Sequence, residues 1–388
     1  MRRRIRCLRQ VNSLNKVILP GQTIGIIGGG QLGRMMALAA KASGFKIAVL
    51  DPTPNCPCGQ VADIEITATY DDLNALQQLA KVSDVITFEF ENISGEALDT
   101  LMSHAYVPQG SELLKTSQNR IIEKRTITES GAKVAPYAVI RNEEDLYEQA
   151  EVIGYPCVLK TATGGYDGKG QYVIKSKEDL EEEEAVKLIQ QSDCVLEKWI
   201  AFSKEISVIV ARNVNGETKV FPVAENIHQD NILHQSIVPA RISRETEQLA
   251  LKQANLIANS MKMVGILAVE MFVTEDGDIY INEIAPRPHN SGHYTMEACE
   301  TSQFEQHIRA VCNWKLGDTT LLKPVVMVNI LGEHMDALLE KVPSLDNWKI
   351  HLYGKSEPKM KRKMGHVNIL RDNTDLALME AEQSNIWS

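Results

Sequence analysis

The sequence predicts an α/β protein of two or three domains, and three observations support that prediction. With 388 residues, the chain is too long for one ordinary hydrophobic core. A strand, a glycine-rich turn, a helix and a second strand are expected in succession over residues 23–51. Two apolar runs within residues 266–284 flank a turn dipeptide, and each carries a glutamate. The first pattern is typical of a parallel sheet covered by helices, and the second of an antiparallel hairpin.

The N-terminal pattern predicts a βαβ unit. An apolar strand at residues 23–27 leads into Gly28, Gly30 and Gly33, and the second strand ends at Asp51. The glycines match G-x-G-x-x-G, and Asp51 stands where a ribose-binding carboxylate stands in a dinucleotide fold. An NAD-binding oxidoreductase is therefore one hypothesis. The alternative is that the glycines only permit a tight turn and close helix packing.

A further buried strand is expected at residues 85–90, and acidic side chains follow its end. These are Glu89, Glu91 and the neighbouring Asn92. Ligands usually gather at the carboxyl ends of the strands in an open parallel sheet. The other interpretation is a solvated loop.

A glycine-rich loop follows Lys160, which ends an expected strand at residues 157–160. The loop contains Gly164, Gly165, Tyr166, Asp167, Gly168, Lys169 and Gly170, and Gln171 comes next. Such a loop can present backbone N–H groups and a lysine to phosphate oxygens, because glycine adopts positive φ freely. It is not a P-loop, since no G-K-[ST] sequence opens a helix. The alternative is a surface hairpin.

The expected hairpin places two carboxylates opposite each other. Asp276-Gly277 favours a two-residue turn, and Glu270 and Glu283 are each six positions from it. In that register their Cβ atoms lie roughly 4.5–5.5 Å apart. Like charges repel at that distance, so the pair predicts a bound Mg²⁺ or Mn²⁺ ion and, with it, a nucleotide phosphate. The alternative is a solvated surface pair, and a register shift would remove the facing geometry.

Composition limits the classes of partner. A formal net charge of −10 argues against a general nucleic-acid binder, and no apolar run approaches the length of a membrane helix. Seven cysteines without paired CxxC spacing support neither a disulfide framework nor a zinc site, so a reducing cytoplasm is expected. The basic start has no apolar signal-peptide core, and residues 1–21 are expected to be a loose extension.

The order of these motifs resembles the ATP-grasp superfamily. The motifs are Lys160, the glycine loop, a connector at residues 197–200, Glu270, and the pair Asn282-Glu283. Within the superfamily, GGYDGKGQ at residues 164–171 and NEIAPRPHNSGHYT at residues 282–295 resemble the N5-carboxyaminoimidazole ribonucleotide synthetases. The resemblance runs from residue 23 to about residue 370.

The resemblance implies an architecture and an activity. It implies a Rossmann-like pre-ATP-grasp domain at residues 22–118 that binds no dinucleotide. An ATP-grasp domain of two α+β subdomains is expected at residues 119–316, and a small β-rich C-terminal domain at residues 317–388. The implied reaction is the ATP-dependent carboxylation of 5-aminoimidazole ribonucleotide by bicarbonate, through carboxyphosphate, in purine biosynthesis. A cytoplasmic homodimer using Mg²⁺ is implied as well. The alternatives are a formate-using ribonucleotide transformylase, a biotin carboxylase or a non-catalytic scaffold.

The resemblance also assigns roles to positions of this chain. Glu270 and Glu283 match the metal ligands. Positions that match ATP contacts are Arg120, Lys160, Gly165, Tyr166, Asp167, Gly168, Lys169, Gly170, Gln171, Glu197, Lys198, Trp199, Ile200, Glu205, His228, Asn282 and Glu283. Of these, the connector from Glu197 to Ile200 is expected to hold the adenine and Glu205 the ribose. Strict strand alternation, however, predicts that Asn282 lies on the opposite face from Glu283.

The ribonucleotide is expected to lie beside the transferred phosphate. Positions that match its contacts are Glu89, Tyr166, Asp167, Lys169, Arg287, His289, Asn290, Lys355 and Arg362. Catalysis is assigned to Asp167, Lys169, Arg287, His289 and Asn290. In the basic run at residues 355–363, Lys361 or Lys363 could take the role of Arg362. The base that removes the amine proton is left open among the departing phosphate, Asp167 and His289.

Overall fold

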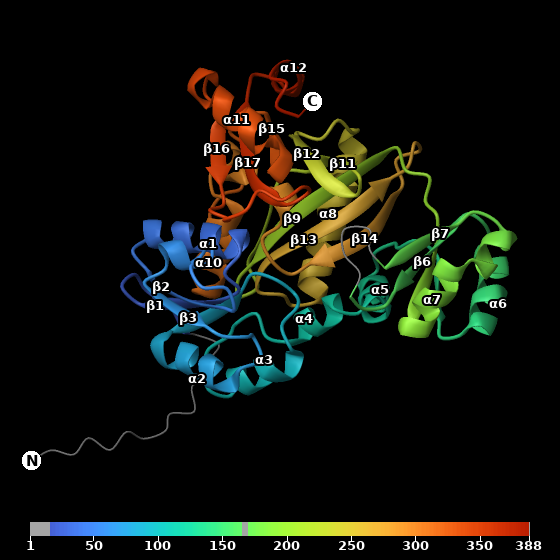
Figure 1. Ribbon diagram of the computed structural model, residues 1–388, viewed down its shortest axis with the longest axis horizontal. Helices are drawn as coiled ribbons and strands as arrows, with labels where there is room; N and C mark the ends of the chain where they lie inside the picture. Colours follow the sequence, from blue (N-terminus) through green and yellow to red (C-terminus); the bar gives the residue numbers. More distant parts are fainter. Residues whose placement is uncertain (1–15, 165–169, 388) are drawn as a thin grey trace, which may run out of the picture.

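The computed structural model describes residues 16–164 and 170–387, and its strands form three sheets (Figure 1). The expected phosphate-loop residues Gly165, Tyr166, Asp167, Gly168 and Lys169 lie outside the described residues, as does most of the expected N-terminal extension. Among the described helices, none combines the length and the apolar character needed to cross a membrane.

The N-terminal sheet is parallel and has the strand order β3-β2-β1-β4. Its strands are β1 (Thr23–Ile27), β2 (Lys46–Asp51), β3 (Ile64–Thr67) and β4 (Val85–Phe88). The helices of this part are α1 (Gln31–Ala42), α2 (Leu73–Val82) and α3 (Gly95–Met102). The expected Rossmann-like βαβ unit is confirmed, because the apolar runs form buried strands and the glycine turn leads directly into α1.

The residues just before β1 are packed, in contrast to the expected loose extension. Ile18 is fully buried in the core that α1 shares with α10 (Gln303–Val311). Its backbone N–H donates to the Cys312 carbonyl at 3.1 Å, and its own carbonyl accepts from the Trp314 indole at 2.7 Å. Burial of one apolar side chain and two hydrogen bonds thus fix Ile18, which the sequence interpretation had assigned to the extension.

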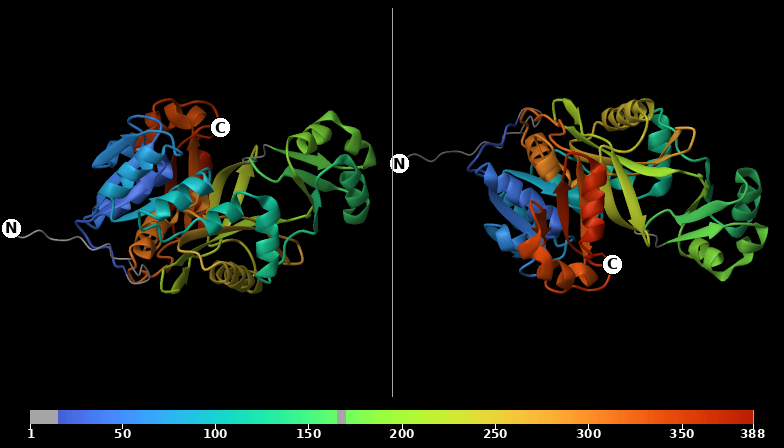
Figure 2. Two further views of the ribbon diagram at one scale, coloured as in Figure 1. Left: turned by 90° about the horizontal axis from the view of Figure 1, so that it is seen from below. Right: turned by 90° about the horizontal axis from the view of Figure 1, so that it is seen from above.

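A second, antiparallel sheet has the order β5-β8-β6-β7 and forms a small subdomain. Its strands are β5 (Tyr137–Ile140), β6 (Cys157–Thr161), β7 (Gln171–Ile174) and β8 (Cys194–Lys198), and its helices are α6 (Glu143–Ile153) and α7 (Glu183–Gln191). Figure 2 shows this subdomain at the opposite end of the molecule from the N-terminal sheet. Its hydrophobic core is separate from the other hydrophobic cores.

The third sheet is the largest and has nine strands, ordered β14-β13-β9-β11-β12-β15-β17-β16 with β10 beside β9. The strands are β9 (Lys204–Arg212), β10 (Thr218–Val220), β11 (Ala224–Gln229), β12 (Ile232–Val238), β13 (Gly265–Val273), β14 (Ile279–Ala285), β15 (Val325–Leu331), β16 (Lys349–Leu352) and β17 (Lys363–Leu370). The remaining helices are α4 (Glu112–Ser117), α5 (Arg120–Glu129), α8 (Arg244–Ser260), α9 (Thr295–Ala298), α11 (Met335–Lys341) and α12 (Thr374–Gln383).

The C-terminal strands extend the central sheet. Strand β15 pairs with β12, and β17 and β16 follow outward from it (Figure 1). The β-rich C-terminal segment expected from the resemblance is therefore hydrogen-bonded to the central strands. Their shared core contains Ile237 of β12 together with Val326 and Val328 of β15.

Candidate active site

The β13–β14 hairpin holds Glu270 opposite Glu283, as predicted, but by a different route. The N–H of Gly277 donates to the Thr274 carbonyl at 3.0 Å, and Gly277 has a φ of 84°. The turn therefore spans three residues, because a residue in the left-handed region extends the β-turn by one position. The predicted two-residue turn is wrong, and the strands begin one residue out of the predicted register.

A bulge at Asn282 restores the register. Val273 pairs with Ile279, but after Asn282 the pairing shifts by one and brings Glu270 to Glu283. Asn282 and Glu283 are both half-buried between buried Ile281 and Ile284. The strict alternation from which Asn282 was predicted to lie on the opposite face from Glu283 is thus interrupted at this point.

Two buried charged residues of α5 hold this bulge in place. The Glu123 carboxylate accepts the Ile284 N–H at 2.8 Å, and the Lys124 ammonium group donates to the Asn282 carbonyl at 2.9 Å. Both side chains are buried. The sequence interpretation missed them, although Lys124 lies three residues before buried Ile127 on the inner helix face.

The electrostatics of the acid pair fit a divalent cation. Burial raises the pKa of Glu270, and the neighbouring charge of Glu283 raises it further. Arg120 Nη1 lies 3.7 Å from Glu283 Oε2, and His289 Nε2 lies 3.3 Å from Glu270 Oε1. Among the described residues, no group of three or more acidic, histidine or cysteine side chains could hold a metal. Two carboxylates suit Mg²⁺, which commonly completes its shell with water and substrate phosphates.

On the other side of the bulge, Glu197 joins two lysines. Its Oε2 atom lies 3.0 Å from the Lys124 ammonium group and 3.3 Å from that of Lys160. Burial alone would raise the pKa of Glu197, but the two lysine charges outweigh it and lower the pKa to about 2. Burial lowers the pKa of Lys160, which Glu197 partly opposes. The Glu197 side chain thus positions Lys160.

The connector offers one backbone donor. The N–H groups of Lys198 and Trp199 are already bound to the carbonyls of Pro136 and Pro156, at 2.8 and 3.1 Å. Within the described part of the chain, the Ile200 N–H has no such partner. The adenine contact expected of this connector stays a prediction, with the Ile200 N–H as its candidate donor.

The remaining residues assigned to the nucleotide form a pair on neighbouring strands. Glu205 of β9 and His228 of β11 lie 3.0 Å apart, between Glu205 Oε2 and His228 Nδ1. Burial would lower the pKa of His228, but the bond and charge of Glu205 raise it overall. Gln171 opens β7 and pairs with Lys160, and Gly170 has a φ of 70°.

The segment after β14 carries three residues assigned to the ribonucleotide. Arg287 Nε lies 2.8 Å from Glu91 Oε1. His289 Nδ1 accepts the Ser291 N–H at 3.3 Å and lies 2.9 Å from the Ser291 hydroxyl, so Nε2 carries the proton of the neutral ring. Burial and the charge of Arg287 lower the pKa of His289 well below its usual value. Asn290 is half-buried, and within the described residues neither of its two buried amide atoms has a hydrogen-bond partner.

The N-terminal glycine turn is filled by the protein's own carboxylates. Glu89 accepts from the N–H groups of Gly30 and, at 2.6 Å, Gly33. Asp51 accepts from Gly29 and from the Tyr70 hydroxyl, each at 2.7 Å. The glycines leave room for these side chains, since a Cβ at position 30 would meet Glu89. The place of a pyrophosphate is thus taken by Glu89, and both of its oxygens face the turn.

The basic run connects β16 to β17, and Lys355 lies at its start. Burial lowers the pKa of Lys355 to about 8, and the nearby charge of Arg362 contributes. Lys361 Nζ is paired with Asp230 at 3.0 Å. Lys363 also acts on Lys355, and its carbonyl accepts from the Lys355 ammonium group at 2.7 Å. Of the three positions left open by the sequence, Arg362 and Lys363 adjoin Lys355, and Lys361 is paired elsewhere.

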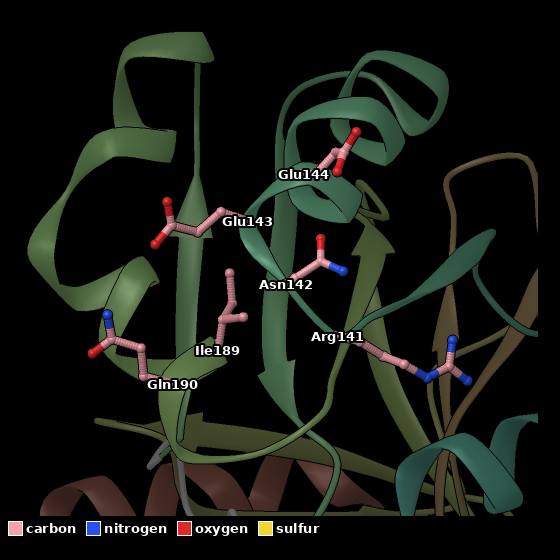
Figure 3. Close-up of a pocket in the computed structure, with 6 residues that line it drawn as sticks. All are labelled: Arg141, Asn142, Glu143, Glu144, Ile189 and Gln190. Atoms are coloured by element: carbon pink, nitrogen blue, oxygen red, sulfur yellow. The ribbon is translucent and has the colours of Figure 1, made fainter.

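A hollow on the small subdomain lies between the ends of α6 and α7 (Figure 3). Two of its polar residues make contacts within the subdomain. The Asn142 side chain accepts the Asp145 N–H at 2.8 Å, and Arg141 pairs with Asp193 at 4.0 Å. None of the predicted site residues lines it.

Comparisons with known protein families match three segments of the chain. The ATP-grasp domain family matches residues 125–304. The ribonucleotide synthetase preATP-grasp domain family matches residues 21–118, and the phosphoribosylaminoimidazole carboxylase C-terminal domain family matches residues 325–380.

Individual relatives agree with these matches. The N5-carboxyaminoimidazole ribonucleotide synthase of Bacillus subtilis (strain 168) is 53 % identical over 372 residues, which cover 96 % of this chain and 97 % of the relative. A crystal structure of an N5-carboxyaminoimidazole ribonucleotide synthetase with ADP is 63 % identical, with a TM-score of 0.93 and coverage of 96 % and 98 %. The Aspergillus clavatus N5-carboxyaminoimidazole synthase, solved with ADP and 5-aminoimidazole ribonucleotide, is 31 % identical, with a TM-score of 0.87 and coverage of 94 % and 97 %. The chain therefore belongs to the N5-carboxyaminoimidazole ribonucleotide synthase family of ATP-grasp ligases.

Proposed function

We propose that this chain converts 5-aminoimidazole ribonucleotide, bicarbonate and ATP into N5-carboxyaminoimidazole ribonucleotide, ADP and phosphate. The observation that carries the proposal is the position of the Glu270–Glu283 pair between two sets of polar residues. Arg120 approaches it from the side of Lys160, and His289 approaches it from the segment assigned to the ribonucleotide. A nucleotide and a second substrate can therefore meet at the acid pair. The ligands named for related structures, ADP and 5-aminoimidazole ribonucleotide, support the same arrangement.

The first step transfers the γ-phosphoryl group of ATP. Lys160 and Arg120 bind phosphate oxygens, and the Ile200 N–H orients the adenine. Glu270 and Glu283 would hold Mg²⁺, which neutralises charge on the phosphate oxygens when it is bound. A bicarbonate oxygen attacks the γ-phosphorus, the bond to the β-phosphate oxygen breaks, and carboxyphosphate and ADP result.

The second step forms the carbon–nitrogen bond. The exocyclic amine of the ribonucleotide attacks the carboxyl carbon of carboxyphosphate, or of CO₂ released from it, and phosphate departs. His289 is poorly placed to take the amine proton, because Ser291 occupies its Nδ1 atom and its protonated Nε2 faces Glu270. We propose the departing phosphate as the base, and Asp167, the other candidate, lies outside the described residues. Arg287 and Asn290 orient the ribonucleotide, and Asn290 has both amide atoms available for it within the described structure.

The test is ADP release with each substrate present or withheld in turn. The proposal requires dependence on both bicarbonate and 5-aminoimidazole ribonucleotide, and a carboxylated product that carries label from ¹³C-bicarbonate. Turnover that requires formate would instead identify a transformylase, and turnover that requires biotin would identify a biotin carboxylase.

The conditions of function are part of the proposal. Mg²⁺ is the metal that best fits two carboxylates and a nucleotide phosphate, with Mn²⁺ as a substitute. A reducing cytoplasm suits the six described cysteines, all of which are buried and unpaired. A homodimer follows from the family resemblance and is tested by sedimentation. The proposed partners are the three small substrates, with neither nucleic acid nor membrane.

A further inference from the structure

The amide side chain of Gln303 binds both backbone polar groups of one residue of the ribonucleotide segment, His289. Its Oε1 atom accepts the His289 N–H at 2.9 Å, and its Nε2 atom donates to the His289 carbonyl at 2.8 Å. Gln303 is fully buried and begins α10, which packs against α1 of the N-terminal sheet. We propose that Gln303 is a positioning residue that fixes residues 287–290 in the conformation that binds the ribonucleotide.

The orientation of the Gln303 amide is itself determined. The two bonds to His289 fix which end of the amide is the nitrogen, so Nε2 also donates to His293 Nδ1, which lies 3.1 Å away. Burial lowers the pKa of His293 to about 3, so the ring is neutral and its Nδ1 atom can accept this bond. The Gln303 backbone N–H donates to the Thr295 hydroxyl at 2.9 Å, and that hydroxyl donates to the Gly292 carbonyl at 2.7 Å. A Cβ at Gly292 would overlap Gln303 Oε1. The turn formed by Asn290–Gly292 thus closes around the amide of Gln303.

The two bonds from Gln303 to His289, called here the clamp, are important because no side-chain hydrogen bond among the described residues holds Asn290 in place. Its side-chain oxygen and nitrogen are both buried and have no partner among the described residues. Its position therefore depends on the backbone of the turn, and the preceding residue, His289, is the one that Gln303 holds at both its N–H and its carbonyl. Loss of the clamp would let Asn290 and Arg287 shift relative to the ribonucleotide without removing any group that touches it.

The same helix provides a matched control. Gln306 lies one turn further along α10, is also fully buried, and brackets Gly317 in the same way. Its Nε2 atom donates to the Gly317 carbonyl at 2.7 Å, and its Oε1 atom accepts the Gly317 N–H at 2.9 Å. Gln303→Met and Gln306→Met each remove two bonds to the backbone of one residue and leave a side chain of similar length, and Gln303→Met also removes the bond to His293. Only the first removes them from the ribonucleotide segment.

The experiment measures affinity for 5-aminoimidazole ribonucleotide in the presence of ADP, affinity for ADP alone, and KM and kcat. Gln303→Met is expected to weaken ribonucleotide binding and raise its KM by about tenfold or more, because two hydrogen bonds that hold the segment are lost. ADP affinity is expected to change by less than about twofold, and Gln306→Met is expected to leave both affinities unchanged. Gln303→Glu keeps the acceptor for the His289 N–H, so it should restore part of the affinity and serves if the methionine variant fails to fold.

Equal ribonucleotide affinity in the wild type and the Gln303 variants, or equal losses in the Gln303 and Gln306 variants, would overturn the inference. The inference rests on the proposed function, and the two can fail separately. If the wild-type protein does not bind the ribonucleotide, the proposed function fails and the inference with it. If the wild type binds it and the Gln303 variants bind equally well, only the inference fails.

Discussion

The Lys124 ammonium group lies 3.0 Å from Glu197 Oε2, and neither side chain is more than 5 % exposed. The same nitrogen donates to the carbonyl of Asn282. One buried cation of α5 therefore connects the strand that positions Lys160 to the bulge that positions Glu283. The nucleotide end and the metal end of the site are joined through this single atom.

Replacing Lys124 with Met should destabilise the protein and weaken nucleotide binding. Removing one partner of a buried ion pair costs roughly 3–5 kcal/mol, because the other charge stays buried. Glu197 would then pair with Lys160 alone, and this pairing would hold the Lys160 ammonium group away from the nucleotide phosphates. Chemical denaturation and calorimetry with ADP measure the two effects. Lys133→Met is the control, since Lys133 is half exposed and its pair with Asp278 is worth at most about 1 kcal/mol. Equal effects in the two variants would contradict the bridging role.

Glu283→Gln should abolish turnover and, at the same time, stabilise the ligand-free protein. The substitution removes one metal ligand, and it also relieves the repulsion that contributes to the raised pKa of Glu270. The expected gain is on the order of 1 kcal/mol, reduced by solvent screening, because the Glu283 side chain is 42 % exposed. Thermal unfolding without nucleotide and steady-state kinetics with Mg²⁺ test the two halves. Glu275→Gln, at the exposed tip of the same hairpin, should change neither quantity. Turnover near the wild-type rate would show that Glu283 is not a metal ligand.

Glu123→Gln should stabilise the protein more at alkaline than at acidic pH. Burial, with the charge of Glu283, raises the pKa of Glu123 from 4.5 to about 7. The folded state therefore holds a proton that the unfolded state releases, and wild-type stability falls as the pH rises through this interval. Glutamine keeps the acceptor for the Ile284 N–H and does not ionise. The advantage of the variant should grow by on the order of 2 kcal/mol between about pH 5 and about pH 8.

Denaturation at the two pH values measures this difference. Glu129→Gln on the exposed side of the same helix is the control. An advantage that does not change with pH would mean that Glu123 is not the titrating group.

Lys355→Ala should weaken ribonucleotide binding selectively. The substitution removes a half-buried cation beside Arg362, and a charge-assisted contact to a phosphate is worth about 1.5–3 kcal/mol, or roughly ten- to a hundredfold in affinity. ADP affinity should hardly change. Lys361→Ala is a control, since Lys361 is exposed and paired with Asp230. If ADP binding weakened instead, the basic run would belong to the nucleotide site.

Local patterns were the part of the fold that the sequence predicted well. The glycine turn after β1 and the strand that ends at Asp51 follow from short-range rules about glycine and apolar runs. The position of Glu270 opposite Glu283 was predicted correctly because two differences from the predicted hairpin cancel each other. The turn is one residue longer than Asp276-Gly277 suggests, and the Asn282 bulge shifts the pairing back.

Residues that act through long-range contacts could not be predicted in this way. In the sequence, Glu123 and Lys124 look like the charged residues of an exposed helix surface. They are buried because α5 packs against β14, which the sequence alone does not indicate. Gln303 gives no signal either, because its partner His289 lies fourteen positions away in an irregular segment. Ile18 is different: the apolar run Val17-Ile18-Leu19 marks it, but no periodicity distinguishes three residues from a loose end.

The pairing of β12 with β15 determines where this chain can be divided. Residues from Gln235 to Val238 are hydrogen-bonded to residues from Val325 to Val328 along the middle of a continuous sheet. A fragment that ends before Val325 would leave β12 with an open, apolar edge, and the separated C-terminal piece would have a matching edge on β15. Unpaired edges of this kind recruit other strands, so the two pieces should aggregate when made alone and reassociate when made together. The C-terminal segment is thus a structural part of the central sheet and cannot be exchanged as a free module.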